Sequence, residues 1–391
     1  MTSAVYNGIN NGHGPHVLQD GCELEVANQH ELKLPNAKND LYTPHSSSIT
    51  KITDVNRNIY GIDETTRPVY DSDADANRFR HIRSARVVPP TLWTPSCHPQ
   101  VEHVSLEVNK WFLDNWPFPH DRARQKFVDA GFSWVTCLYY PLAKDDRIHF
   151  ACRLLTILFL IDDVLESMSL EDGKKYNDNL MPLARGDVLP NRDVPVEYMF
   201  YDLWHDMRCH DEELANEILE PTFVFMRAQT DKVRKQMTDF GQYLEYREGD
   251  VGKALLSALM RFVMDLQLSA GELQEMKPVE QNCSKHISIV NDIYSWEKEL
   301  KQSQDNAEEG SHLCTGVQIL SSCAGLDIPA AKACLWTMVR EWEVKHEILC
   351  SAPHLSANIS KSSLLYLKGL EYQMSGNELW SRMTPRYLVV E

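Results

Sequence analysis

The chain has 391 residues, of which 43% are hydrophobic and 24% are charged, a composition typical of a globular protein. Its formal net charge of −17 argues against nucleic acid or an anionic membrane as the main partner. The ten cysteines are scattered without a Cys-x-x-Cys pair, so neither a disulfide framework nor a zinc site is indicated.

The first 90 residues differ in composition from the rest of the chain. They are rich in Asn, His, Asp, Ser and Gly and show no sustained hydrophobic period, so we predict a disordered N-terminal extension at 1–90. Met1 leads into polar residues without an apolar targeting core, and no apolar run approaches the length of a membrane span. We therefore expect a cytoplasmic protein that does not cross a membrane.

Helical periodicity begins after Pro89-Pro90 and continues to the C-terminus. A helix is predicted from His98 onward, and residues 147–168 predict a nearly all-apolar helix that is central and buried. Strand-like alternation is scarce, so residues 91–391 predict one all-α domain. Further helices are predicted at 196–208, 212–237, 252–268, 279–304, 329–350 and 361–374.

An acidic series closes the apolar helix at 147–168. Asp162 and Glu166 are one helical turn apart and would point to the same side, with Asp163 turned aside. Like charges at this spacing repel, and burial beside apolar residues adds a desolvation cost. A bound cation would offset both effects, whereas the alternative is a solvent-exposed helix end.

A second series of oxygen-bearing side chains lies further along the chain. Asn291, Ser295 and Glu299 follow an i, i+4, i+8 spacing and stay within about 80° of arc on a helix. Such oxygen ligands suit Mg²⁺, which binds proteins through a few carboxylates together with substrate phosphates. Taken alone, the series is also compatible with an ordinary polar helix face. The two series together predict a metal-clamped polyanion at the mouth of an apolar cavity.

These motifs resemble those of the class I terpene synthases. Asp162–Glu166 resembles the family's aspartate-rich motif in its D-D-x-x-E form, and Asn291–Glu299 matches N-D-x-x-S-x-x-x-E, the family's second magnesium motif. The pair Arg386-Tyr387 matches the family's C-terminal Arg-Tyr pair. The resemblance extends from about His98 to Tyr387 and is closest to the fungal aristolochene synthase subfamily. It implies a single class I terpenoid synthase helical bundle with a central active-site cavity.

The resemblance also implies the substrate and the cofactor. The substrate would be farnesyl diphosphate, and three Mg²⁺ ions would clamp its diphosphate. Asp162 would bridge two ions, and Asn291, Ser295 and Glu299 would chelate the third. The residues expected to hydrogen-bond the diphosphate as the site closes are Arg247, Lys298, Arg386 and Tyr387.

The resemblance further implies an aromatic cavity in which Tyr139, Phe159, Phe225 and Trp380 take part in catalysis together with Arg247 and Lys298. Ring faces stabilise a passing positive charge by about 0.5–2 kcal/mol each. Without the resemblance, ordinary core packing explains any one of these aromatic residues equally well. The implied reaction proceeds through germacrene A and a eudesmane cation to aristolochene, with release of diphosphate.

The chain departs from the pattern of the subfamily at several positions, including Pro385 before Arg386. Val263 and Asp265 stand where close relatives carry Ser and Gly, and Trp296 stands where Tyr is usual. We expect these changes to affect the product more than the enzyme class. The alternatives are another sesquiterpene product, a chain-elongating prenyltransferase or a non-catalytic helical diphosphate-binding protein. The sequence leaves the stereochemistry of the product and a homodimer open.

Overall fold

The computed structural model describes residues 88–352 and 359–388, which form α-helices and short 3₁₀ helices and contain no strand. The all-α prediction is confirmed, whereas the disorder predicted for 1–90 falls on residues that, except for 88–90, lie outside the described part. The helices are α3 (Val101–Asn115), α4 (Asp121–Ala130), α5 (Phe132–Tyr139), α6 (Ile148–Leu165), α7 (Leu170–Arg185), α8 (Pro195–His210), α9 (Glu212–Gln229), η1 (Lys232–Gln236), α10 (Phe240–Asp250), α11 (Lys253–Met264), α12 (Ala270–Asp305), η2 (Glu309–Ser311), α13 (Gly316–Ala324), α14 (Ile328–Cys350), α16 (Lys361–Met383) and η3 (Pro385–Tyr387).

Helix α6 runs through the main hydrophobic core, as its apolar sequence predicts. Residues such as Leu154, Ile157 and Ile161 are fully enclosed by side chains, and α6 packs against α3, α5, α8 and α11. The helix ends at Leu165, so Asp162 and Asp163 occupy its last turn. The acidic series is therefore presented at the end of a helix whose position is held by burial on all sides.

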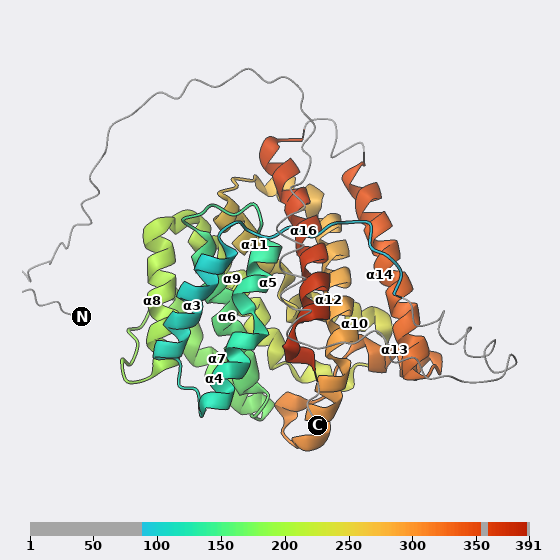
Figure 1. Ribbon diagram of the computed structural model, residues 1–391, viewed down its shortest axis with the longest axis horizontal. Coiled ribbons are helices and arrows are strands. Elements are labelled where there is room, and N and C mark those ends of the chain that lie inside the picture. Colours follow the sequence, from blue (N-terminus) through green and yellow to red (C-terminus); the bar gives the residue numbers. More distant parts are fainter. Residues whose placement is uncertain (1–87, 353–358, 389–391) are drawn as a thin grey trace, which may run out of the picture. The chain divides into compact units, whose positions relative to one another are not determined.

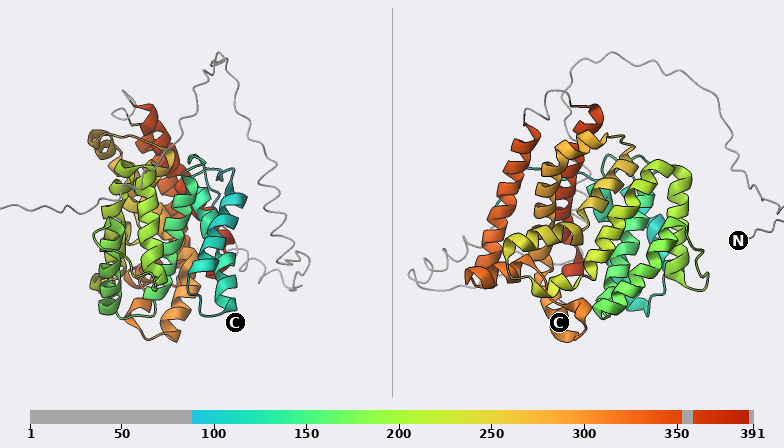
Figure 2. Two further views of the ribbon diagram at one scale, coloured as in Figure 1. Left: turned by 90° about the vertical axis from the view of Figure 1, so that its left-hand side faces the viewer. Right: turned by 180° about the vertical axis from the view of Figure 1, so that it is seen from behind.

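Helix α12 carries the second series and lies between α14 and α16 (Figures 1 and 2). Its start is well defined, because the Ser269 side chain caps the first turn and the Glu272 carboxylate accepts a hydrogen bond from the backbone N–H of Ser269. A second hydrophobic core lies between α10, α12, α13 and α14. Helix α12 is thus anchored on two sides, and its remaining face is available to the site.

Helix α16 approaches α5 closely at Gly376. A Cβ atom at this position would lie 2.7 Å from the carbonyl oxygen of Leu138. Only a glycine allows this separation, because backbone atoms of α5 cannot yield as the end of a flexible side chain would. Beside this contact, the Tyr139 hydroxyl of α5 donates a hydrogen bond to Asn377 of α16 at 2.8 Å.

We expect Gly376→Ala to lower the free energy of unfolding by about 1–3 kcal/mol, because the added methyl group forces α16 away from α5. The measurement is the midpoint of thermal unfolding followed by circular dichroism. Gly271→Ala is the matched control: its Cβ would meet only Ser269 Oγ, at 3.9 Å, so this change should leave stability equal or slightly higher. Equal midpoints for the two variants would contradict the proposed tight contact.

The helix predictions hold best for the long apolar segments. The helix predicted at 212–237 ends at Gln229, because Asp231 caps a separate 3₁₀ helix. The helix predicted at 252–268 ends at Met264, because Asp265 has a left-handed backbone with φ of 57°. Helices α4, α5, α7, α10 and α13 were not predicted; they are short or mostly polar, and tertiary contacts stabilise them.

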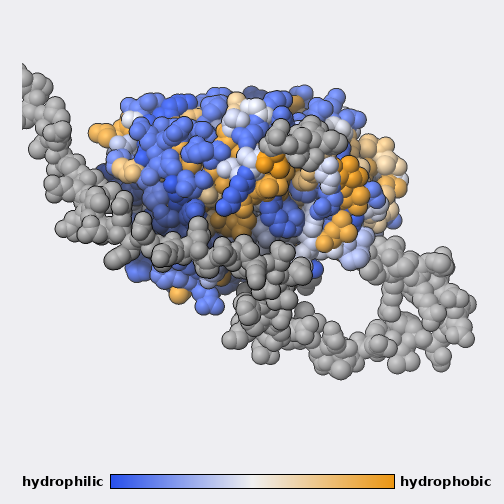
Figure 3. Space-filling model, turned by 90° about the horizontal axis from the view of Figure 1, so that it is seen from above, coloured by the Kyte–Doolittle hydropathy of each residue, from blue (hydrophilic) through white to orange (hydrophobic). Residues whose placement is uncertain are grey.

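None of the described helices is long and apolar enough to cross a bilayer. The face shown in Figure 3 is mostly hydrophilic, with hydrophobic residues in separate small areas. The most exposed large hydrophobic side chains include Leu106, Leu189 and Ile348, which belong to different segments.

Candidate active site

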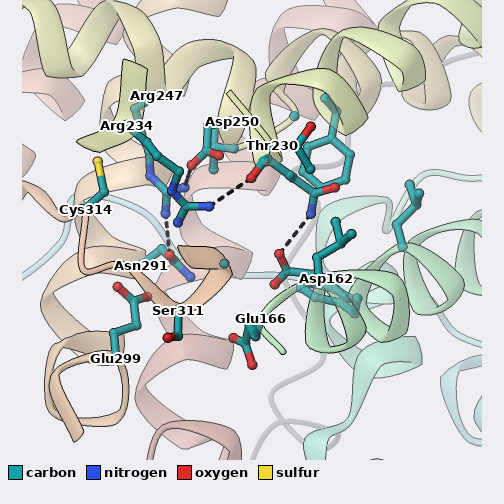
Figure 4. Close-up of a pocket in the computed structure, with 18 of the residues that line it drawn as sticks. Asp162, Glu166, Thr230, Arg234, Arg247, Asp250, Asn291, Glu299, Ser311 and Cys314 are labelled. Carbon is teal, nitrogen blue, oxygen red and sulfur yellow. Dashed lines mark hydrogen bonds and ion pairs between the residues drawn. The ribbon is translucent and has the colours of Figure 1, made fainter. Parts of the chain in front are cut away.

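A cavity of about 220 Å³ lies between α5, α6, α9, α10, α11, α12 and α16. Acidic and amide side chains of α6 and α12 face each other across its polar part (Figure 4). Its apolar lining includes Leu155, Leu158, Leu255, Leu256 and Ile287. Every residue that the sequence predicts for the site lines this cavity except Ser295, which lies on α12 between two lining residues.

The acidic series of α6 is concentrated at one edge of the cavity. Carboxylate oxygens of Asp162, Asp163 and Glu166 lie within 4.8 Å of one another, close enough to share a metal ion. Burial and the charges of its two acidic neighbours raise the pKa of Asp162 to about 7. A carboxyl group in this situation gains from a cation, so the edge fits a metal site of oxygen ligands.

The other two carboxylates of this edge already have partners. Arg386 donates two hydrogen bonds to Asp163, at 3.1 and 2.6 Å. Burial lowers the pKa of Arg386, but the Asp163 carboxylate outweighs this effect and holds the pKa above its ordinary value. Lys298 donates to Glu166 at 3.3 Å, and Gln302 donates to its other oxygen. Asp163 thus pairs with Arg386, although its carboxylate stays within 4.8 Å of those of Asp162 and Glu166, closer than the helical spacing predicts.

The series of α12, made of Asn291, Ser295 and Glu299, lies across the cavity from the acidic series of α6 (Figure 4). Asn291 accepts a hydrogen bond from Arg247 at 2.8 Å and donates one to the Tyr387 hydroxyl at 2.6 Å. Ser295 is only 1% exposed, and its hydroxyl has no hydrogen-bond partner of normal geometry among the described residues. Burial and the charge of Asp292 raise the pKa of Glu299. A buried hydroxyl beside a destabilised carboxylate suits a site for an oxygen-bound cation.

Asp292 belongs to the same motif but has a different position. It is fully buried and accepts hydrogen bonds from the Tyr243 hydroxyl, from the backbone N–H of Gly316 at 2.8 Å and from Arg247 at 3.2 Å. These contacts join α10 and α13 to α12. Asp292 therefore orients Arg247, which in turn reaches the cavity.

The aromatic wall of the cavity is built by mutual packing. Phe159 stacks on Phe132 with ring centres 4.6 Å apart, and Trp380 lies 6.0 Å from Phe159. The Arg386 guanidinium lies over both phenylalanine rings, 5.3 and 5.8 Å from their centres. Trp380 is fixed by a hydrogen bond to the carbonyl oxygen of Ala130 at 3.0 Å. The cation and the rings hold each other in place at the junction of the polar and apolar parts.

Tyr139 of α5 and Phe225 of α9 also line the cavity. The Tyr139 hydroxyl donates to Asn377 at 2.8 Å, and Asn377 donates to the carbonyl oxygen of Ile287. Phe225 packs against Gly252, where a Cβ would lie 3.1 Å from its ring and where φ is +70°. All four aromatic residues named from the sequence line the cavity, and their role in catalysis stays a prediction.

Several polar residues of the cavity were missed from sequence. Gln229, Arg234, Gln302 and Asn377 all line it. Gln302 follows Lys298 by four residues on α12, so continuing the helical spacing would have found it. Gln229 and Arg234 come from the end of α9 and from η1, where no local pattern indicates a site.

Three of the positions that depart from the subfamily lie away from the cavity. Val263 and Asp265 are at the end of α11, and neither is among the described residues that line the cavity. Val263 accepts a backbone hydrogen bond from Lys144 at 2.7 Å, and the Asp265 carboxylate is 3.5 Å from Arg147. Trp296 packs in the second hydrophobic core. Any influence on the product would have to pass through the packing of α11 or α12.

Comparison with known proteins agrees with this geometry. The family model "Terpene synthase family 2, C-terminal metal binding" matches residues 153–345. This range contains both the acidic series of α6 and the oxygen-bearing series of α12. An aristolochene synthase of Aspergillus terreus is 59% identical over 302 residues, which cover 77% of this chain and 94% of that protein. The chain belongs to the terpene synthase family.

Solved structures of terpene synthases show the same fold. The crystal structure of aristolochene synthase from Penicillium roqueforti matches with a TM-score of 0.67 and 58% identity, over 76% of this chain and 99% of that one. A hedycaryol synthase in complex with nerolidol matches with a TM-score of 0.61 at 17% identity, over 75% and 99%, a likeness of fold alone. The predicted family and its helical fold are confirmed, and the acidic cluster of α6 lies within the family's metal-binding domain.

Proposed function

We propose that this terpene synthase is a sesquiterpene cyclase that ionises farnesyl diphosphate in the presence of Mg²⁺ and cyclises it to aristolochene, with release of diphosphate. Two opposed series of oxygen ligands beside an apolar, aromatic cavity carry this proposal. The product is supported by the relative from Aspergillus terreus, an aristolochene synthase to which the chain is 59% identical.

We infer that three Mg²⁺ ions bind, with Asp162, Asn291, Ser295 and Glu299 as their ligands. The bound ions would supply Lewis-acid stabilisation of the negative charge on the leaving diphosphate. The donor set is made of oxygens, and a cation would relieve the repulsion around Asp162.

We propose that four side chains bind the diphosphate directly: the cationic groups of Arg247, Lys298 and Arg386 and the hydroxyl of Tyr387. Ionisation breaks the bond between the allylic carbon and oxygen, and both electrons leave with the diphosphate oxygen. Charged N–H donors aimed at that oxygen stabilise the charge as it develops. Arg386 lines the cavity and lies over the rings of Phe132 and Phe159, which supports the proposal that it would lie beside the bond that breaks.

The cavity would then protect and shape the carbocation. We propose germacrene A and a eudesmane cation as intermediates, enclosed by Tyr139, Phe159, Phe225 and Trp380. Aromatic faces stabilise a cation by about 0.5–2 kcal/mol each, and exclusion of water prevents its capture. Burial raises the pKa of the Cys314 thiol in the cavity to about 12, so at neutral pH it is not a thiolate that would trap the cation.

The test is incubation of the purified chain with farnesyl diphosphate and Mg²⁺, followed by gas chromatography–mass spectrometry of an organic extract on a chiral column. One dominant aristolochene peak that disappears with EDTA is the expected result. Another metal-dependent sesquiterpene would retain the enzyme class and refute the proposed product. Absence of hydrocarbon from farnesyl, geranyl and geranylgeranyl diphosphates would refute the cyclase.

We expect Phe159→Leu to reduce cyclisation turnover by about tenfold and to raise the share of incompletely cyclised hydrocarbons, because one cation-stabilising ring face is lost. The measurement is the product distribution together with kcat. Phe127→Leu is the matched control, because Phe127 is a buried ring of the same core that does not line the cavity among the described residues. A product change as large in the control as in Phe159→Leu would refute a direct role of the cavity ring.

The remaining sequence-based expectations stay proposals. We propose that residues 91–391 form the catalytic domain and 1–90 an extension of it. The cytoplasmic location and the homodimer are predictions that await measurement.

A further inference from the structure

Gln229 has a buried side-chain amide at the edge of the cavity where Asp162, Asp163 and Glu166 lie. It belongs to neither of the two sequence motifs. It is the last residue of α9, is 6% exposed and lines the cavity. Its side-chain N–H donates to Asp162 Oδ1 at 2.9 Å. The residues lie 67 positions apart in the chain, so only the tertiary structure brings the end of α9 to the end of α6.

The end of α9 is held by side chains from three other elements. The last carbonyl groups of a helix lack partners within the helix, and here they are satisfied from outside. Asn177 of α7 donates to the carbonyl oxygen of Met226 at 2.7 Å, and Tyr246 of α10 donates to that of Ala228 at 3.1 Å. Arg234 of η1 donates to the backbone oxygen of Gln229 itself at 2.9 Å. Gln229 therefore projects from a fixed backbone, as a residue that orients a metal ligand must.

The oxygen of the Gln229 side-chain amide is buried and accepts no hydrogen bond from the described residues. A buried amide oxygen without a donor is unfavourable, so a donor that is absent from the protein alone is indicated. Magnesium sites in proteins retain several bound waters, and these waters are donors. Being neutral, the amide also adds no repulsion to the carboxylates of α6.

We propose that Gln229 is a positioning residue of the metal site. Its N–H orients the Asp162 carboxylate, and its free oxygen accepts a hydrogen bond from a water on the ion that Asp162 binds. This inference rests on the proposed function, because it assumes that Asp162 is a magnesium ligand.

The experiment compares the full chain with its Gln229→Met variant, which keeps the length of the side chain but removes both hydrogen-bonding atoms. Thermal unfolding is recorded at increasing Mg²⁺ in the presence of inorganic diphosphate, and the Mg²⁺ concentration for half-maximal stabilisation is determined. We expect this concentration to rise by about tenfold or more in the variant. In steady-state assays the Mg²⁺ requirement should rise similarly, while kcat at saturating Mg²⁺ changes much less.

Gln125→Met is the matched control. Gln125 donates to Asp129 at 2.8 Å on the exposed face of α4, so this variant loses the same kind of pair outside the site and should keep the wild-type Mg²⁺ requirement. Should Gln229→Met not fold, Gln229→Asn retains the amide on a shorter side chain and is expected to shift the requirement in the same direction.

The experiment distinguishes failure of the proposed metal site from failure of the proposed role of Gln229. If Mg²⁺ and inorganic diphosphate do not stabilise the wild-type chain, the proposed metal site is wrong. If they stabilise it and both Gln229 variants have Mg²⁺ requirements within twofold of wild type, the site stands and the role of Gln229 is refuted. An equal loss of kcat at every Mg²⁺ concentration would also refute it.

Discussion

Glu299→Gln is expected to lower kcat/KM for farnesyl diphosphate by roughly 10²–10³-fold. Glutamine has nearly the same shape but no charge, so the site loses one negative ligand while its packing is kept. Glu299 is the residue of the α12 series that carries a full charge, and burial already raises its pKa. The loss should therefore appear as a higher Mg²⁺ requirement and as a lower rate at saturating Mg²⁺.

Steady-state kinetics at several Mg²⁺ concentrations test this expectation. Glu297→Gln is the matched control on the same helix, because the Glu297 side chain is 58% exposed and pairs with Lys332 at the surface. An exposed ion pair contributes little, so this control should stay within about twofold of wild type. Wild-type kinetics for Glu299→Gln over the whole Mg²⁺ range would show that Glu299 is not a metal ligand.

Asp162→Asn is expected to have opposite effects on stability and on metal binding. In the metal-free chain the pKa of Asp162 is about 7, above its ordinary value of 3.8, so the charged carboxylate destabilises the folded state. This destabilisation grows as pH rises from about 4 to about 7 and is constant above that range. Asparagine does not titrate, so the variant should be more stable by about 1–2 kcal/mol at pH 8, a value reduced for partial exposure of the site.

The same variant should lose the stabilisation that Mg²⁺ and inorganic diphosphate give to the wild type. Thermal unfolding at pH 5 and pH 8, each with and without these ligands, measures both effects in one series. The expected pattern is a variant that is more stable in the absence of metal by a smaller margin at pH 5 than at pH 8, and a response to Mg²⁺ only in the wild type. A variant that is less stable than wild type at pH 8 would show that Asp162 is not under electrostatic strain.

The sequence predicts the fold well where a helix can be recognised from its own residues. The apolar period of 147–168 indicates α6 because few other structures bury such a segment on all sides. It does not indicate α7 or α10, whose sequences are mostly polar and whose helices depend on neighbours. It also misses the end of α9, because the pattern continues through residues that form a separate 3₁₀ helix.

For the site, the spacing of Asn291, Ser295 and Glu299 places them on one face of a helix, and the spacing of Asp162 and Glu166 does the same. The reason is that the geometry of a helix is local, so a four-residue interval is enough. With the resemblance to a family, the sequence thus determined the enzyme class, the metal ligands to test and the aromatic residues of the cavity.

Only the tertiary structure decided which of these groups meet. It places the end of α6 opposite α12, pairs Asp163 with Arg386 across 223 positions and brings Gln229 to Asp162. It also decides which carboxyl group has an altered pKa, because burial and neighbouring charges come from other elements. Such contacts depend on how whole helices pack against one another. The spacing of residues within one segment does not specify which helices become neighbours.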